Sequence, residues 1–169
     1  MGKTILGQEM HKKRRFIMST ATPINQHISK DEVAIRLLIE RIHEAHHDKD
    51  AAAIAAAYAP DAVVCDLAPP LSHRGINIEE KKAWLATWDG PIERESRDLE
   101  ITVSGDFALC HGYLRIGGTP KAAGRPISFW MRTSVGLRRT QGGWEIVHEH
   151  TSVPFYMDGS LRPAFDLQP

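Results

Sequence analysis

Apolar residues recur at helical spacing where the folded part of the chain is expected to begin. Ser29 and Glu32 have the spacing of a capping box, in which a serine and a glutamate satisfy the first free amides of a helix. After them, one apolar residue in every three or four predicts a helix over about 31–47. The apolar stripe consists of Ala34, Leu37, Leu38, Ile42 and Ala45.

Shorter patterns follow as far as residue 91. The expected elements, in chain order, are a helix over 51–58 capped by Asp48 or Asp50, a strand over 62–65, a turn at Pro69-Pro70, and a third helix that starts after Asn77 and stops at Gly90-Pro91. The apolar side of this third helix comprises Ile78, Trp84, Leu85 and Trp88.

From Ile92 onward the pattern becomes one of strands separated by turns. We predict four strands, at about 93–104, 107–117, 126–140 and 143–153. Helices first and hairpin strands afterwards are typical of an α+β domain, in which helices cover one face of an antiparallel sheet.

Composition and charge exclude several classes of protein. The chain has 169 residues with 21 basic and 21 acidic side chains, which fits one globular domain and argues against a nucleic-acid binder. No apolar run is long enough to span a membrane. The charges are not evenly distributed, because residues 1–17 are mostly basic. We expect 1–28 to be a flexible leader and 29–169 to be a single domain. We expect a cytoplasmic protein.

Strand alternation predicts where a ligand could bind. In the last strand it puts His148, His150 and Ser152 on the face of Trp144 and Ile146, and Glu149 and Thr151 on the other face. In the preceding strand Trp130, Arg132 and Ser134 share a face. We expect the faces with the histidines and Arg132 to line one pocket, although a solvated or subunit-facing side is the alternative.

Other chemistry has weaker support from the residues. His148 and His150 could chelate a metal, but no matching carboxylate follows them, and we expect neither metal nor cofactor. His46 and His47 near a helix end fit a solvated site. Asp66 ends a strand beside apolar, proline-rich sequence, so it fits either a proton-shuttling acid of raised pKa or a turn cap.

Two stretches resemble a known family. Tyr58 to Asp66 (YAPDAVVCD) resembles the helix-to-strand passage of ketosteroid isomerases and SnoaL-like cyclases, and Gly143 to Phe155 (GWEIVHEHTSVPF) resembles the last strand of a SnoaL-like branch of the nuclear-transport-factor-2-like superfamily. The resemblance implies a conical α+β fold with three helices packed on a curved, mostly antiparallel sheet, a ligand cavity and a homodimer.

The resemblance carries over to the site only in part. In ketosteroid isomerases the aspartate that matches Asp66 shuttles a proton, but the oxyanion-hole donors fall at Ile42 and near Thr133 here, so steroid isomerisation is not expected. We assign catalysis to Asp66 and His150. The ligand-binding candidates are Tyr58, His73, Trp84, His111, Tyr113, Trp130, Arg132, Ser134, His148 and Ser152.

Two functions are compatible with this site. The first is a cofactor-free isomerase or cyclase that moves a proton on a small carbonyl compound, with an anionic or enolisable ligand. The alternative is a non-catalytic ligand-binding or oligomerisation module, like the association domain of calcium/calmodulin-dependent kinase, because one fold hosts many functions.

Overall fold

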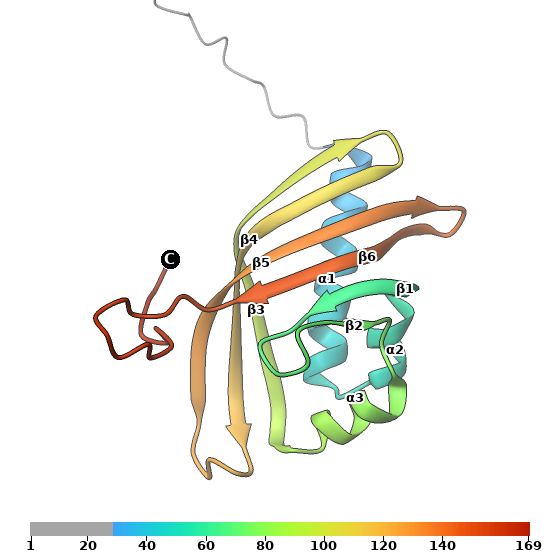
Figure 1. Cartoon of the computed structure of the whole chain (residues 1–169). Helices are drawn as coiled ribbons and strands as arrows, with labels where there is room; N and C mark the ends of the chain where they lie inside the picture. Colours follow the sequence, from blue (N-terminus) through green and yellow to red (C-terminus); the bar gives the residue numbers. More distant parts are fainter. Residues whose placement is uncertain (1–28) are drawn as a thin grey trace, which may run out of the picture.

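The computed structural model describes residues 29–169, and the predicted leader over 1–28 lies outside the described residues. Three helices and six strands follow one another along this part of the chain (Figure 1). In order they are α1 (Lys30–His47), α2 (Ala51–Ala56), β1 (Tyr58–Cys65), β2 (His73–Arg74), α3 (Ile78–Leu85), β3 (Trp88–Ser104), β4 (Phe107–Pro120), β5 (Ile127–Thr140) and β6 (Gly143–Ser152).

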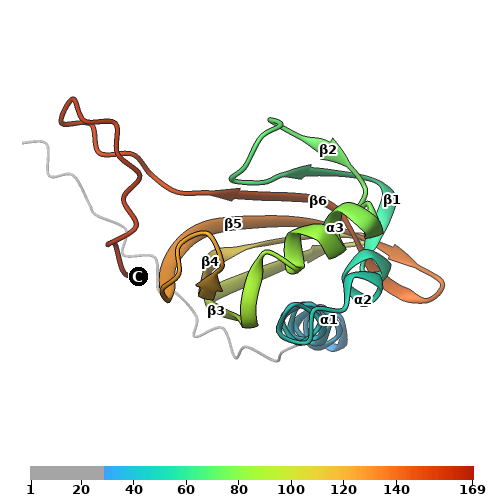
Figure 2. The same cartoon turned by 90° about the horizontal axis from the view of Figure 1, so that it is seen from below.

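The six strands form one curved sheet, in the order β2-β1-β6-β5-β4-β3. Only the β1–β6 pair is parallel within the described residues, so the expected mostly antiparallel α+β fold is confirmed. The helices lie on one side of the sheet (Figure 2), which we call the inner face; the opposite side is the outer face.

Strand β3 contains an irregularity of the kind that bends a strand. The pairing of β3 with β4 shifts between Arg97 and Glu100, where Asp98 has a φ of 50°. Gly112 of β4 lies opposite, and a Cβ there would come within 2.8 Å of the Asp98 carbonyl oxygen. A side chain at position 112 would therefore clash with the backbone of the bulge.

Helix α1 supplies the centre of the core. Ser29 caps it by accepting a hydrogen bond from the Glu32 amide at 3.1 Å, as the capping box predicts. The buried apolar side differs from the predicted one by part of a turn, because Leu37 is 54% exposed. The buried residues of α1 are Ile35, Leu38, Ile39, Ile42, His43, Ala45 and His46.

Two predicted boundaries are wrong. Helix α2 ends at Ala56, and β1 begins at Tyr58 because this residue pairs with Ile146 of β6. Pro60 is tolerated in the strand since β2 pairs only with positions 63 and 64. The second is the end of the third helix: Trp88, expected in that helix, is the first residue of β3 and pairs with Pro120. In addition, the short strand β2 was not predicted.

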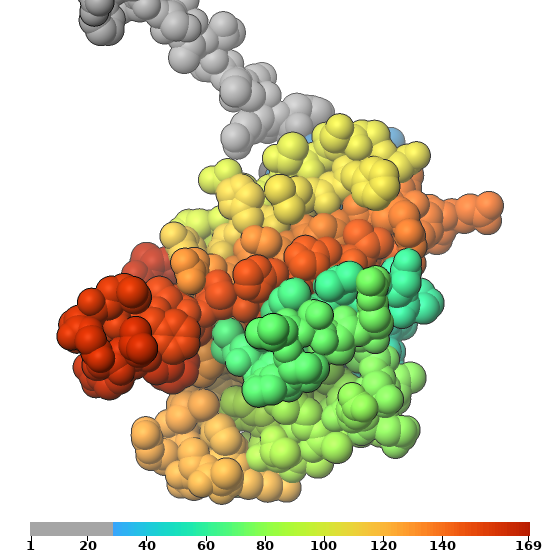
Figure 3. All heavy atoms as spheres, in the orientation of Figure 1, coloured from blue at the N-terminus to red at the C-terminus, as the bar shows by residue number. Residues whose placement is uncertain are grey.

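After β6 the chain forms a compact tail, which Figure 3 shows as a separate mass at one end of the sheet. An isolated bridge joins Phe155 to Pro163, and the Phe165 ring lies 4.4 Å from the Phe129 ring, centroid to centroid. Among residues 29–169 no helix is long and apolar enough to cross a membrane.

Candidate functional site

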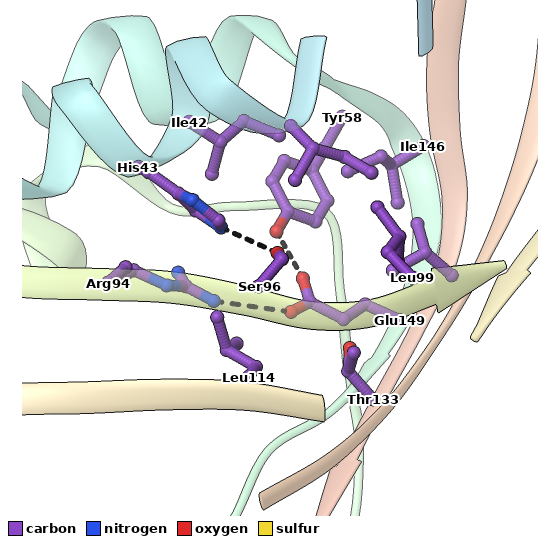
Figure 4. A pocket seen from close by; sticks show the side chains of 12 residues that line it. Ile42, His43, Tyr58, Arg94, Ser96, Leu99, Leu114, Thr133, Ile146 and Glu149 are labelled. Atoms are coloured by element: carbon purple, nitrogen blue, oxygen red, sulfur yellow. Dashed lines mark hydrogen bonds and ion pairs between the residues drawn. The ribbon is translucent and has the colours of Figure 1, made fainter. Parts of the chain in front are cut away.

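A narrow cavity lies between α1 and the inner face of the sheet (Figure 4), and we call it the inner cavity. Its volume of about 30 Å³ suffices for about two water molecules. Most of the lining is apolar, with polar groups from α1, β1, β3, β5 and β6. The lining residues are Ile39, Ile42, His43, Tyr58, Arg94, Ser96, Leu99, Leu114, Thr133, Val135, Ile146 and Glu149.

Glu149 of β6 is the acid of this cavity. Its side chain is 10% exposed, and its carboxylate accepts a hydrogen bond from the Tyr58 hydroxyl of β1. Arg94 of β3, 12% exposed, brings its Nη2 within 3.8 Å of Glu149 Oε1. A buried carboxylate needs such partners because it has lost most of its contact with water.

Arg94 is held from the other side by a histidine of α1. His46 Nδ1 lies 2.7 Å from the Ile42 carbonyl oxygen, an acceptor, so Nδ1 carries the proton. His46 Nε2 is then free to accept from Arg94 Nη1 at 2.8 Å. Burial, followed by the charge of Arg94, lowers the pKa of His46 to about 2, which keeps this ring uncharged at neutral pH.

One donor of Arg94 remains unused. The Nε of Arg94 is buried and has no hydrogen-bond partner among residues 29–169. An unsatisfied buried donor costs about 1–3 kcal/mol, so a native protein that keeps one has a reason for it. Because Arg94 lines the inner cavity, an acceptor atom of a ligand could take this hydrogen bond.

A second histidine of α1 faces the same space. His43 is 8% exposed and its Nε2 lies 3.5 Å from the Ser96 hydroxyl. Burial, with the charge of Arg94 as a smaller cause, lowers the pKa of His43 to about 4. His43 is therefore a neutral hydrogen-bonding group above about pH 5. The expectation that His46 is solvated near the helix end is wrong, because His46 is 3% exposed.

The predicted grouping of β6 side chains is also wrong. Trp144 and Ile146 do face α1, but the pairing with β5 shifts where Gly136 opposes His148 and Leu137 opposes Ile146. One extra residue, Val147, is thus accommodated as a β-bulge, and the alternation changes phase. Beyond the bulge Glu149 and Thr151 are the buried residues.

The predicted ligand-binding side chains of the sheet come together on the outer face. His111, Ser134 and His150 are directly opposite one another across β4, β5 and β6, and so are Tyr113, Arg132 and Ser152. His148 lies on the same face and its Nδ1 is 2.9 Å from the Val63 carbonyl oxygen. None of these residues lines the inner cavity, and their role in ligand binding stays a prediction.

Trp130 shares the outer face but is 7% exposed. The Arg97 guanidinium stacks 4.4 Å from its ring, and its Nε1 donates to Gln168 Oε1 at 2.9 Å. The tail after β6 therefore contributes to the burial of this tryptophan.

Asp66 lies at the end of β1, where its side chain is 47% exposed. Asp66 is therefore open to solvent, as is the chain after it as far as Ser72. Asp66 Oδ2 is 3.3 Å from His73 Nε2, so these two predicted residues do meet. The catalytic roles of Asp66 and His150 stay predictions.

Of the remaining predicted residues, Tyr58 alone lines the inner cavity. Trp84 is 37% exposed and packs edge-on against His46 and Trp88, with ring centroids 6.2 and 5.9 Å apart. The residues that sequence reasoning missed are His43, Arg94, Ser96, Thr133 and Glu149. The sequence pattern that could have indicated this site is the pair His43 and His46, which are three positions apart beside the apolar stripe of the first helix.

Metal binding and thiol chemistry have little support among residues 29–169. Within 29–169 no group of three or more histidine, cysteine, aspartate or glutamate side chains could hold a metal ion. Burial raises the pKa of the Cys110 thiol to about 11, which disfavours the reactive thiolate.

Both the sequence and the fold are similar to those of known proteins. The profile of the SnoaL-like domain matches residues 35–156, and the chain belongs to this family, within the nuclear-transport-factor-2-like superfamily. An NTF2-like protein of unknown function from Pseudomonas putida is similar at 35% identity and a TM-score of 0.71, covering 82% of this chain and 96% of that one. A search of curated proteins gave no match.

Two more distant structures share the fold. One, from Streptomyces avermitilis, is described as a candidate dehydratase of the NTF2-like family, with 20% identity, a TM-score of 0.63 and coverage of 73% of this chain and 96% of that one. The other is described as a candidate calcium/calmodulin-dependent kinase II association domain from Xanthomonas campestris, with 16% identity, a TM-score of 0.64 and coverage of 75% and 89%.

Proposed function

We propose that the protein binds a small carbonyl compound in the inner cavity and catalyses cofactor-free proton transfer on it, as an isomerase or cyclase. One observation carries the proposal: a carboxylate and an unused cationic donor, Glu149 and Arg94 Nε, are buried at the same apolar cavity. In such surroundings, fixed charges act on a reacting group far more strongly than they do in water.

The two residues divide the reaction between them. The Glu149 carboxylate takes a proton from the carbon next to the ligand's carbonyl, and the electron pair moves to the carbonyl oxygen. Arg94 Nε donates a hydrogen bond to the enolate oxygen that forms. Return of the proton from Glu149 to another carbon completes an isomerisation. In a cyclisation the enolate carbon instead attacks a second carbonyl of the ligand, which closes a ring, and the alkoxide that forms takes the proton from Glu149.

The neighbours of this pair support the same roles. Tyr58 donates to Glu149 and so orients the carboxylate. His46 accepts from Arg94 Nη1, which fixes the guanidinium and leaves its Nε without a partner. Because the volume of the cavity is about 30 Å³, only the reacting end of a ligand fits beside Glu149.

Burial favours Glu149 over the acid predicted from sequence. The Glu149 side chain is 10% exposed and the Asp66 side chain 47%, so the Glu149 carboxylate is the one whose charge acts on a ligand with little screening by water. The non-catalytic alternative is less favoured, because a purely structural ion pair has no use for an unpartnered donor at a cavity.

Solvent-deuterium exchange tests the proposal without knowledge of the natural substrate. Small ketones, aldehydes and esters are incubated with the protein in D2O, and proton NMR follows the loss of α-hydrogens. We expect exchange with the wild type, a loss of at least about 100-fold in Glu149→Gln and a similar loss in Arg94→Gln. Glu145→Gln, on the same strand but paired with Arg138 at 2.6 Å, is the matched control.

The catalytic proposal fails if Glu149→Gln exchanges hydrogens as fast as the wild type, or if compounds that bind the protein show no exchange above the rate in buffer. A loss of exchange in Glu145→Gln as large as in Glu149→Gln would also contradict it, because this substitution lies outside the inner cavity.

A homodimer also stays a prediction. The outer face carries Leu109, 51% exposed, and Tyr113, 39% exposed, as apolar area that a second copy could cover. Sedimentation velocity of the wild type and Leu109→Lys tests this: we expect a dimer that Leu109→Lys converts to monomer, and equal sedimentation of the two would exclude this face.

A further inference from the structure

A serine, a histidine and a glutamate follow one another beside the inner cavity. The Ser96 hydroxyl of β3 lies 3.5 Å from His43 Nε2, and both side chains line the cavity (Figure 4). On the other side of the ring, His43 Nδ1 is 3.9 Å from Oε2 of Glu40, which comes one turn earlier in α1. Hydrolases that act through a serine have this arrangement of nucleophile, base and orienting group, and its distances are often longer when no substrate is bound.

The Glu40 carboxylate indicates which ring nitrogen of His43 carries the proton. An ionised carboxylate only accepts hydrogen bonds, so the nitrogen next to it, Nδ1, is the protonated one. Nε2 is then the acceptor that faces the Ser96 hydroxyl. The side chain of His43 is 9% exposed and that of Glu40 is 65% exposed, so the base is enclosed while the group that orients it is at the surface.

The unused donor of Arg94 belongs to the same group of side chains. Arg94 and Ser96 are two residues apart in a regular part of β3, so both side chains lie on the inner face. Arg94 Nε is buried and, in the part of the chain that the structure describes, has no hydrogen-bond partner. When a hydroxyl attacks a carbonyl group, negative charge develops on the carbonyl oxygen, and a donor fixed beside the hydroxyl stabilises it.

We propose that Ser96 is a nucleophile that takes the acyl group of a small ester, with His43 as its base and Arg94 Nε as the donor to the oxyanion. The proposal goes beyond proton transfer at carbon, because a different base acts and a C–O bond is broken. It shares only the inner cavity and Arg94 with the proposed function. Because the cavity volume is about 30 Å³, the acyl group must be small, such as acetyl.

The reaction needs only the ester and water. Ser96 Oγ attacks the carbonyl carbon, its proton passes to His43 Nε2, and the electron pair of the C=O bond moves to the oxygen. When the C=O bond forms again, the alcohol leaves with the proton from His43, and Ser96 carries the acyl group. Water then attacks the acyl carbon with His43 again as the base, which releases the carboxylic acid and restores Ser96.

The positive charge that His43 gains is balanced within the site. In the resting protein burial, followed by the charge of Arg94, lowers the pKa of His43 to about 4, so the ring is free to accept a proton at neutral pH. As the oxyanion forms next to Arg94, its negative charge offsets that of the guanidinium. The protonated ring also has the Glu40 carboxylate beside Nδ1.

Labelling with methanesulfonyl fluoride tests the nucleophile on the intact protein. This reagent is as small as an acetyl ester, and its loss of fluoride leaves a stable sulfonate on a reactive serine, which peptide mass spectrometry locates. We expect Ser96 to be labelled at least about 100-fold faster than Ser104, which is on the same strand but exposed. The rate at Ser96 should fall only below about pH 5, because His43 then takes up a proton.

Matched variants separate the roles in the hydrolysis of para-nitrophenyl acetate. Ser96→Ala should lose the hydrolysis above the rate in buffer, while Ser104→Ala should keep it. His43→Gln should slow it by about 100-fold. Glu40 is a positioning residue, so Glu40→Gln should lower kcat several-fold and leave KM unchanged.

Equal labelling of Ser96 and Ser104 in the folded protein would overturn the proposal, and so would a labelling rate at Ser96 that His43→Gln leaves unchanged. Deuterium exchange that depends on Glu149 would survive either result, so the two proposals can fail separately.

Discussion

The two faces of the sheet treat polar side chains in opposite ways. On the inner face Glu149 and His43 are buried, the Arg94 side chain is 12% exposed, and all three are joined to specific partners. On the outer face His150, His111 and Arg132 are exposed. Consecutive residues of β6 thus differ in exposure: the Glu149 side chain is buried, and the His150 side chain is exposed to solvent. Exposure to water, more than residue type, decides which of these groups can do unusual chemistry.

The difference also concerns energy. A charge that is buried with its partner gains little for folding but costs much when the partner is removed, while an exposed charge contributes little in either case. Substitutions at matched positions on the two faces should therefore have very different effects on stability, and three such comparisons are accessible to experiment.

The largest effect is expected for Glu149→Ala. It leaves the Arg94 guanidinium buried next to an empty site, and removal of one partner of a buried pair costs about 3–5 kcal/mol. His150→Ala, one residue along on the outer face, should change the free energy of unfolding by less than about 0.5 kcal/mol. Urea denaturation of both variants measures this contrast; equal losses would mean that Glu149 is not shielded as described.

A smaller effect is expected from pH. The folded-state pKa of His43, about 4, lies below its value of 6.5 in the unfolded chain, so the unfolded state binds more protons as the pH falls below 6.5. The stability due to neutral His43 is full above pH 6.5 and is lost toward pH 4. Between pH 7 and 4.5 this loss should be about 2–3 kcal/mol.

Denaturation at several pH values isolates the contribution of His43. His43→Gln should lose less stability than the wild type between pH 7 and 4.5, by the same 2–3 kcal/mol (order of magnitude). Ser134→Ala on the outer face should keep the pH dependence of the wild type. If His43→Gln also kept it, His43 would have to be accessible to protons in the folded state.

The smallest effect is expected for Tyr58→Phe. This change removes the hydroxyl that donates to Glu149, and a hydrogen bond to a charged group contributes about 1.5–3 kcal/mol. We expect a loss near the lower end, since the ring itself keeps its packing. Tyr113→Phe on the outer face should be close to neutral. A Tyr58→Phe variant as stable as the wild type would show that Glu149 is satisfied without Tyr58.

Much of the fold could be predicted from local sequence. The capping box at Ser29, the turn residues between the later strands and the change from helical to alternating spacing identify three helices and the long strands. The start of β1 could not be predicted in this way. Tyr58 looks like the end of a helix before Pro60, and only its pairing with Ile146, far along the chain, makes it part of the sheet.

The site was less predictable because it depends on the phase of a strand. Regular alternation puts His148 and His150 on the face of Ile146, and nothing in the local sequence marks Val147 as an extra residue. The bulge is apparent only from the partner strand, where Gly136 and Leu137 oppose His148 and Ile146. One undetected residue was enough to exchange Glu149 and His150 between the faces.

The tolerance of β6 to changes in length follows from the same bulge. A strand usually cannot lose a residue without turning half of its side chains to the wrong side. Here, deletion of Val147 would make Ile146 and His148 consecutive residues, which lie on opposite faces of a regular strand, and leave Glu149 at the cavity, still opposite Val135. Deletion of Glu145 instead would force the strand either to change its turn or to shift its register. Val147 can thus be deleted without moving the other side chains of β6 to the opposite face, which offers a way to shorten this strand.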